Sequence, residues 1–127
     1  MKNVIPAVLL SVSATLLPAQ ALAHGSEEPE HGGAVQMSGE IKVEFVPSKK
    51  GMTVYISEED EPLAASGFNA RLVVTTPAGQ KLTSTLSPQS GNRFVAPGVT
   101  AISGSKVVVA LEDKGSGAKS FATFRMK

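Results

Sequence analysis

Residues 34–45 read AVQMSGEIKVEF. Small or apolar residues stand at every second position, and this set is Val35, Met37, Gly39, Ile41, Val43 and Phe45. The positions between them are polar and include Lys42 and Glu44. An alternation with period two is typical of a strand that has one face in the core and the other in water. We therefore expect one long strand over residues 34–45, with Met37 in the core and Lys42 and Glu44 in water.

A second strand is expected directly after this one. Residues 47–51 (PSKKG) have turn composition, and residues 52–57 resume the alternation with Met52, Val54 and Ile56 on one side. Pairing Phe45 with Val54 and Val43 with Ile56 keeps both apolar sets on the same face. The pattern predicts a tight antiparallel hairpin.

The rest of the chain has the same character. Further strands are expected over residues 68–75, 81–86, 92–96, 106–112 and 118–126, with Gly, Pro and Ser between them. In the last of these strands Phe121 and Phe124 have opposite parity, so both face one core only if the strand contains a bulge. About seven short strands predict an all-β domain over residues 34–127, an antiparallel immunoglobulin-like sandwich. A small closed barrel is the alternative.

The start of the chain predicts export. Residues 1–23 combine Lys2, an apolar run over residues 4–17 and the triplet Ala21-Leu22-Ala23, which is the pattern of a cleaved signal peptide. The run is shorter than the roughly 20 residues that a spanning helix needs, so a retained anchor is the less favoured hypothesis. We expect cleavage after Ala23, a periplasmic product and no membrane insertion.

The composition narrows the classes of partner. The chain has no cysteine, so the exported domain is held by packing alone. Without Lys2, basic and acidic residues are equal in number. Nothing in this balance favours a nucleic acid as partner.

Residues 24–33 (HGSEEPEHGG) form a segment without large apolar side chains. Such a composition buries too little surface to offset the entropy cost of ordering, so we expect a flexible tail. Both histidines of the chain lie in it.

This tail is the candidate metal site. After cleavage His24 is the N-terminal residue and offers its amine and its imidazole, and His31 supplies a third nitrogen. Nitrogen ligands suit Cu(II), favoured by the affinity order, or Zn(II). The nearby Glu27, Glu28 and Glu30 add negative charge and oxygen ligands.

Other hypotheses remain open for the same residues. The histidine spacing matches no closed zinc pattern, and an acidic, glycine-containing leader is also typical of a solvated linker. The acidic run over residues 58–61 lacks the spacing of a calcium loop and is expected to be solvated. With both histidines in a tail, no rigid nucleophile and base are expected, so the chain is not predicted to be an enzyme. A copper enzyme using His24 is a distant third hypothesis.

Several strings carry a family resemblance: EHGGAV at residues 30–35, IKVEFV at 41–46, VYI at 54–56, EP at 61–62 and LSPQSGNRF at 86–94. Together they resemble small periplasmic modules, and similar E-H-G-G stretches open the periplasmic adaptor subunits of heavy-metal efflux pumps. The resemblance implies an exported β-sandwich in metal handling, with His31 as the residue carried over and an envelope efflux protein as a partner. The adaptor's helical hairpin and lipoyl-like domain have no counterpart here, which argues against a pump-assembly role.

The sequence thus predicts a non-catalytic periplasmic protein that binds a transition-metal ion, a metal chaperone or sensor associated with metal efflux or resistance. The alternative is a non-enzymatic interaction module of the cell envelope, which meets a protein through a sheet face or an edge strand.

Overall fold

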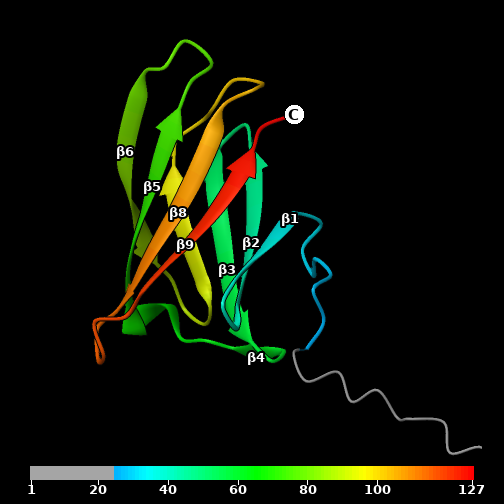
Figure 1. The fold of residues 1–127 in the computed structure, drawn as a ribbon, viewed down its shortest axis with the longest axis vertical. Coiled ribbons are helices and arrows are strands. Elements are labelled where there is room, and N and C mark those ends of the chain that lie inside the picture. Colours follow the sequence, from blue (N-terminus) through cyan, green and yellow to red (C-terminus); the bar gives the residue numbers. More distant parts are fainter. Residues whose placement is uncertain (1–24) are drawn as a thin grey trace, which may run out of the picture.

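The computed structural model describes residues 25–127, which form an all-β fold (Figure 1). The predicted signal peptide and His24 lie outside these residues. The elements are β1 Ala34–Ser38, β2 Ile41–Ser48, β3 Gly51–Glu58, β4 Glu61–Pro62, the 3-10 turn η1 Ala65–Gly67, β5 Phe68–Thr75, β6 Lys81–Pro88, β7 Arg93–Pro97, β8 Lys106–Asp113 and β9 Lys119–Arg125.

The strands form one antiparallel sheet that curls almost into a barrel. Their order is β1-β2-β3-β7-β6-β5-β8-β9, and β4 adds to β3. The two ends of this order meet, because β1 lies against β9 and the backbone N–H of Phe121 donates to Ser38 Oγ at 3.1 Å. The antiparallel all-β prediction is confirmed, although the sheet has nine strands rather than about seven.

The predicted hairpin is present as β2 and β3. Phe45 pairs with Val54 and Val43 with Ile56, as the register argument expects. All four side chains are buried and form part of the core inside the curled sheet. Met52 also lies in this core, as its parity predicts.

The expectation of one strand over residues 34–45 is wrong. The chain turns back at Gly39 and Glu40, so that β1 pairs with β2 and Met37 faces Lys42. Gly39 has a φ of 59°, a left-handed conformation that glycine adopts without a steric penalty. Since partners across a ladder share a face, Met37 lies beside Lys42 on the outer face and is half-buried, not in the core.

Strand β9 resolves the ambiguity of its two phenylalanines without a bulge. Its pairing with β8 is continuous from Lys106–Arg125 to Glu112–Lys119. Phe124 points inward and its ring lies 5.1 Å from that of Phe45, whereas Phe121 points outward and is 56% exposed.

Candidate functional site

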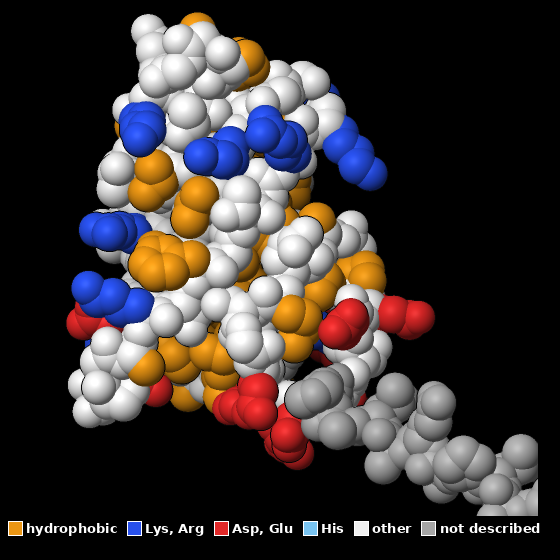
Figure 2. Space-filling model, viewed as in Figure 1, with side chains coloured by type: hydrophobic (Ala, Val, Ile, Leu, Met, Phe, Trp, Pro, Cys, Tyr) orange, Lys and Arg blue, Asp and Glu red, His pale blue; other side chains and the backbone are white. Residues whose placement is uncertain are grey.

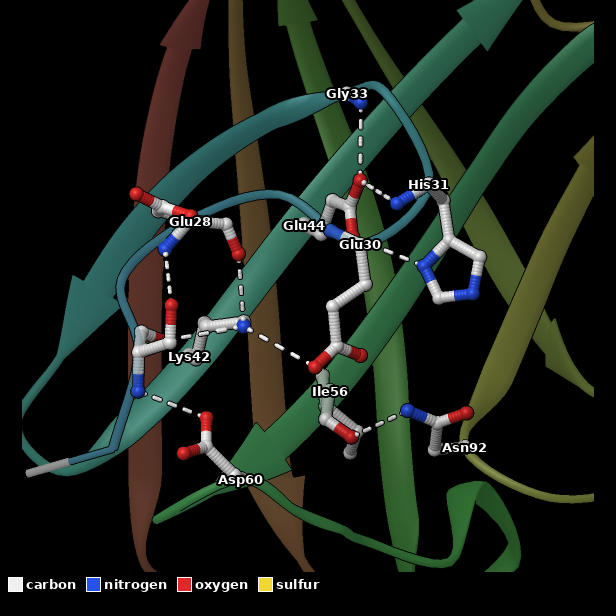
Figure 3. Close-up of polar contacts among 10 residues, drawn as sticks. Glu28, Glu30, His31, Gly33, Lys42, Glu44, Ile56, Asp60 and Asn92 are labelled. Carbon is white, nitrogen blue, oxygen red and sulfur yellow. Dashed lines mark hydrogen bonds and ion pairs between the residues drawn. The ribbon is translucent and has the colours of Figure 1, made fainter.

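The most distinctive polar site of the fold is a buried carboxylate on the outer face of β2. Glu44 is only 2% exposed, although its position in the alternation points it away from the core. Its Oε1 accepts hydrogen bonds from the backbone N–H of Glu30 at 3.0 Å and from His31 Nδ1 at 2.9 Å. Its Oε2 accepts from the backbone N–H groups of His31 at 2.8 Å and Gly33 at 2.9 Å (Figure 3). We call these four donors the Glu44 cradle.

Two glycines allow the chain to wrap around this carboxylate, for different reasons. Gly32 has a φ of +72°, which strains any residue with a side chain, but a Cβ there has open space around it. Gly33 has an ordinary φ, but its Cβ would stand 2.4 Å from the carbonyl oxygen of Phe45. Gly32 therefore supplies the turn, and Gly33 allows the backbone to lie close against β2.

A second buried charge ties down the segment before the cradle. Lys42 is 5% exposed, and its Nζ donates to the carbonyl oxygens of Ser26 at 3.1 Å and Glu28 at 2.9 Å. The same Nζ lies 3.7 Å from Glu30 Oε1 (Figure 3). Lys42 and Glu44 are two residues apart on β2, so their side chains stand on the same face. Residues 26–33 cover both side chains and keep them from water.

Residues 25–33 lie against β2 and the β3–β4 turn through polar contacts, in the segment where composition predicts a flexible tail. The backbone N–H of Ser26 also donates to Asp60 Oδ1 at 2.8 Å in the β3–β4 turn. Composition reported apolar burial alone. It left out the stabilisation that two buried charges gain from backbone groups, and charge-assisted bonds of this kind are stronger than neutral ones.

The cradle keeps Glu44 ionised. Burial raises the pKa of Glu44, but the hydrogen bonds from the His31 ring and from the backbone of Gly33, His31 and Glu30 outweigh it. The net result is a pKa of Glu44 below its ordinary value of 4.5. An ionised carboxylate only accepts hydrogen bonds, so the proton of the 2.9 Å contact lies on His31 Nδ1. In the neutral ring the lone pair is then on Nε2.

The His31 ring is also fixed from one side by an aromatic contact. It stacks on Tyr55 of β3 with ring centroids 3.5 Å apart and an angle of 2° between the planes. The side chain remains 37% exposed. Stacking and the bond to Glu44 together hold the imidazole in one orientation.

The structure brings only part of the predicted ligand set to this place. His31 is held in the cradle, the Glu30 carboxylate lies beside Lys42, and Glu27 and Glu28 are exposed. Within residues 25–127 no three His, Cys, Asp or Glu side chains are grouped as a metal site. His24 precedes this range.

Glu44, Lys42 and Tyr55 are the residues of the site that the sequence argument missed. Strand alternation assigned Lys42 and Glu44 to water, which is the usual place for outward charges. Their neighbour across the strand pair, Tyr55, shares that outer face through its pairing with Glu44. The available signal in the sequence was the pair of opposite charges, two residues apart, beside an outward-facing Tyr. This signal does not reveal which segment covers the two charges.

The acidic run at residues 58–61 forms the tight β3–β4 turn, with Glu59 and Asp60 exposed. The hydrogen bond between Glu58 and Glu40, together with burial and repulsion from Glu40 and Glu59, raises the pKa of Glu58. These carboxylates therefore repel one another in a solvated turn.

In the part of the chain from residue 25 onward, no helix is long and apolar enough to cross a membrane. The resemblance to E-H-G-G modules of metal efflux remains an expectation. No family model, curated protein or solved structure matches this chain.

Proposed function

We propose that this protein is an exported, non-catalytic accessory protein that binds a transition-metal ion through Nε2 of His31. One observation carries the proposal: Glu44 takes the Nδ1–H of His31 at 2.9 Å and leaves Nε2 as the free nitrogen. Metal-ligating histidines in proteins commonly donate their other ring N–H to a carboxylate in this way. The arrangement fixes the tautomer and the orientation of the ring.

The remaining ligands are proposed to come from the N-terminus. Signal-peptide cleavage after Ala23 makes His24 the first residue of a periplasmic protein and frees its amine beside its imidazole. Glu27 and Glu28 are exposed and available as oxygen ligands, whereas the carboxylate of Glu30 forms an ion pair with Lys42. The proposed ion is Cu(II), with Zn(II) second, because nitrogen-rich sites favour copper in the divalent series.

An immunoglobulin-like sandwich remains our proposal for the finer fold class.

The chemistry of the residues present fits such an ion. A buried, ionised carboxylate stands behind the ligand, and the stacked Tyr55 ring limits the motion of the imidazole. A pre-oriented ligand loses less entropy when the ion binds. His31 would therefore be the pre-oriented ligand, and the segment before it would supply the remaining ligands.

The first test is a calorimetric titration of Cu(II), then Zn(II), into protein expressed with its signal sequence, purified from the periplasm and checked for its N-terminus by mass spectrometry. We expect tight one-to-one binding that weakens by about tenfold or more in His31→Ala, because a direct ligand is lost. His24→Ala, or one extra residue before His24, should weaken binding as well. Glu61→Gln on β4 removes an exposed charge near the site and is the matched control.

Binding of unchanged affinity in His31→Ala would contradict the proposal. If only the N-terminal extension leaves the affinity unchanged, then the amine of His24 is not a ligand, and His31 acts with other residues.

A further inference from the structure

A second surface lies on the other half of the sheet, on strands that carry no part of the Glu44 cradle. It is the outer face of β6, β5, β8 and β9, and the strand register places its residues in four rows. Lys81, Thr75, Lys106 and Arg125 form the first row, Thr83, Val73, Val108 and Thr123 the second, Thr85, Arg71, Ala110 and Phe121 the third, and Asn69, Glu112 and Lys119 the fourth. We call this surface the basic face.

The charges of the basic face are nearly all of one sign. Five cationic side chains stand in these rows and one carboxylate, that of Glu112. In the view of Figure 2, Lys and Arg side chains lie with hydrophobic side chains among them, and the Asp and Glu side chains that are visible lie over the lower half. The only ion pairs among residues 25–127 are those of His31 and Lys42, so the cations of the basic face have no carboxylate partner there.

A pocket lies between the cations. The pocket has a volume of about 460 Å³, and its lining includes Arg71, Ala110, Lys114, Lys119 and Phe121. The Phe121 side chain is 56% exposed, an unusual position for a large aromatic ring. An exposed ring in a hollow with a charged rim is the layout of a protein interface, in which apolar anchors lie at the centre and polar groups around them.

We propose that the basic face binds an extended acidic segment of a partner protein, with an apolar side chain of that segment in the pocket beside Phe121. Lys81, Lys106 and Arg125 stand in the first row of the face. Arg71 stands in the third row and Lys119 in the fourth, where Glu112 is the one carboxylate, and Lys114 joins them in the pocket lining. Residues on one face of a strand recur about every 7 Å, so three row steps span roughly 20 Å. An extended segment of about six residues covers this distance, with acidic residues at both ends and the apolar residue between.

Charge and shape favour this occupant over the alternatives. A lipid surface is flat, whereas the apolar residues here lie in a hollow between the cations. A single exposed aromatic ring offers little of the repeated stacking that single-stranded nucleic acids use. A second copy docking its acidic β3–β4 turn here would make a head-to-tail contact, which propagates into open chains unless the rotation closes a ring.

The test is fluorescence anisotropy with a labelled peptide that has Leu-Phe at its centre and Asp and Glu on both sides, titrated with purified protein in the presence of a chelator. The chelator makes the result independent of His31. We expect saturable binding that falls with added salt and is absent for the same peptide with Lys in place of the acids. Phe121→Ser and Arg71→Glu should each weaken binding by about tenfold, since one removes the anchor and the other reverses a rim charge. Lys49→Glu in the β2–β3 turn is the matched control and should bind as the wild type does.

Thermal unfolding of each variant, which should match the wild type because both side chains are exposed, excludes loss of the fold as a cause. Equal affinity of Phe121→Ser, Arg71→Glu and Lys49→Glu would overturn the proposal. Binding to phosphatidylglycerol vesicles or to single-stranded DNA that Arg71→Glu abolishes, without peptide binding, would assign the face to those ligands instead. Self-association that Arg71→Glu abolishes, without peptide binding, would assign it to a second copy.

Discussion

Replacing Glu44 by Ala is expected to lower the free energy of unfolding by about 3 kcal/mol, since four hydrogen bonds to one buried, ionised acceptor are lost at once and each contributes about 1 kcal/mol. Glu44 is 2% exposed and accepts three backbone N–H groups and the His31 ring. The same change should release the N-terminal segment from β2. Urea unfolding measures the loss of stability, and hydrogen exchange at the amides of Glu30, His31 and Gly33 measures the release.

Glu112→Ala is the control, because Glu112 is also a strand carboxylate, but among the described residues its side chain accepts no hydrogen bond. It should change stability by no more than about 0.5 kcal/mol. Equal stability of Glu44→Ala and Glu112→Ala would contradict the role given to the cradle.

The same carboxylate predicts a dependence of stability on pH. Because the folded-state pKa of Glu44 lies below 4.5, its contribution is complete above the unfolded value and is lost as the pH falls through the folded-state pKa. Glu44→Gln, which cannot ionise, should lack this part of the acid sensitivity. Chemical unfolding at a series of acidic pH values compares the two proteins.

Gly33→Ala is expected to cost about 2–3 kcal/mol, because the new Cβ would stand 2.4 Å from the carbonyl oxygen of Phe45 and 2.8 Å from Val46 Cγ2. The carbonyl belongs to β2 and cannot move away without shifting that strand. The backbone N–H at position 33 would then also lose its hydrogen bond to Glu44 Oε2. Urea unfolding of the variant checks the loss.

Gly32→Ala separates crowding from backbone strain. No atom lies within 4 Å of a Cβ at Gly32, so its cost is only that of a φ of +72°, about 1 kcal/mol. The account requires Gly33→Ala to cost more than Gly32→Ala. The reverse order would mean that the chain does not approach β2 as closely as described.

The sequence predicted the strands well where the alternation of apolar and polar residues matches the inner and outer faces of the sheet. The β2–β3 register follows from the alternation together with a tight turn, because the pairs Phe45–Val54 and Val43–Ile56 keep both apolar sets on one face. It failed at residues 34–45, since a two-residue turn at Gly39 and Glu40 leaves the alternation intact while it reverses the chain. The apolar parity of Met37 was therefore assigned to the wrong side of the sheet.

The candidate site was predicted only in part, for a related reason. His31 was identified from its rarity and its neighbours in the sequence. Glu44 was not, because its burial depends on a segment that comes back over β2 through hydrogen bonds. Periodicity reports which residues share a face, but it does not report what covers that face.

The most direct measurement is a nitrogen-15 NMR spectrum of the histidine side chains at pH 8, recorded before and after one equivalent of Zn(II), with His24→Ala used to assign the two rings. The account predicts a His31 ring protonated at Nδ1 before addition, and a large shift of its Nε2 resonance when the metal is added. A ring protonated at Nε2, or an Nε2 resonance that Zn(II) leaves unchanged, would contradict the account.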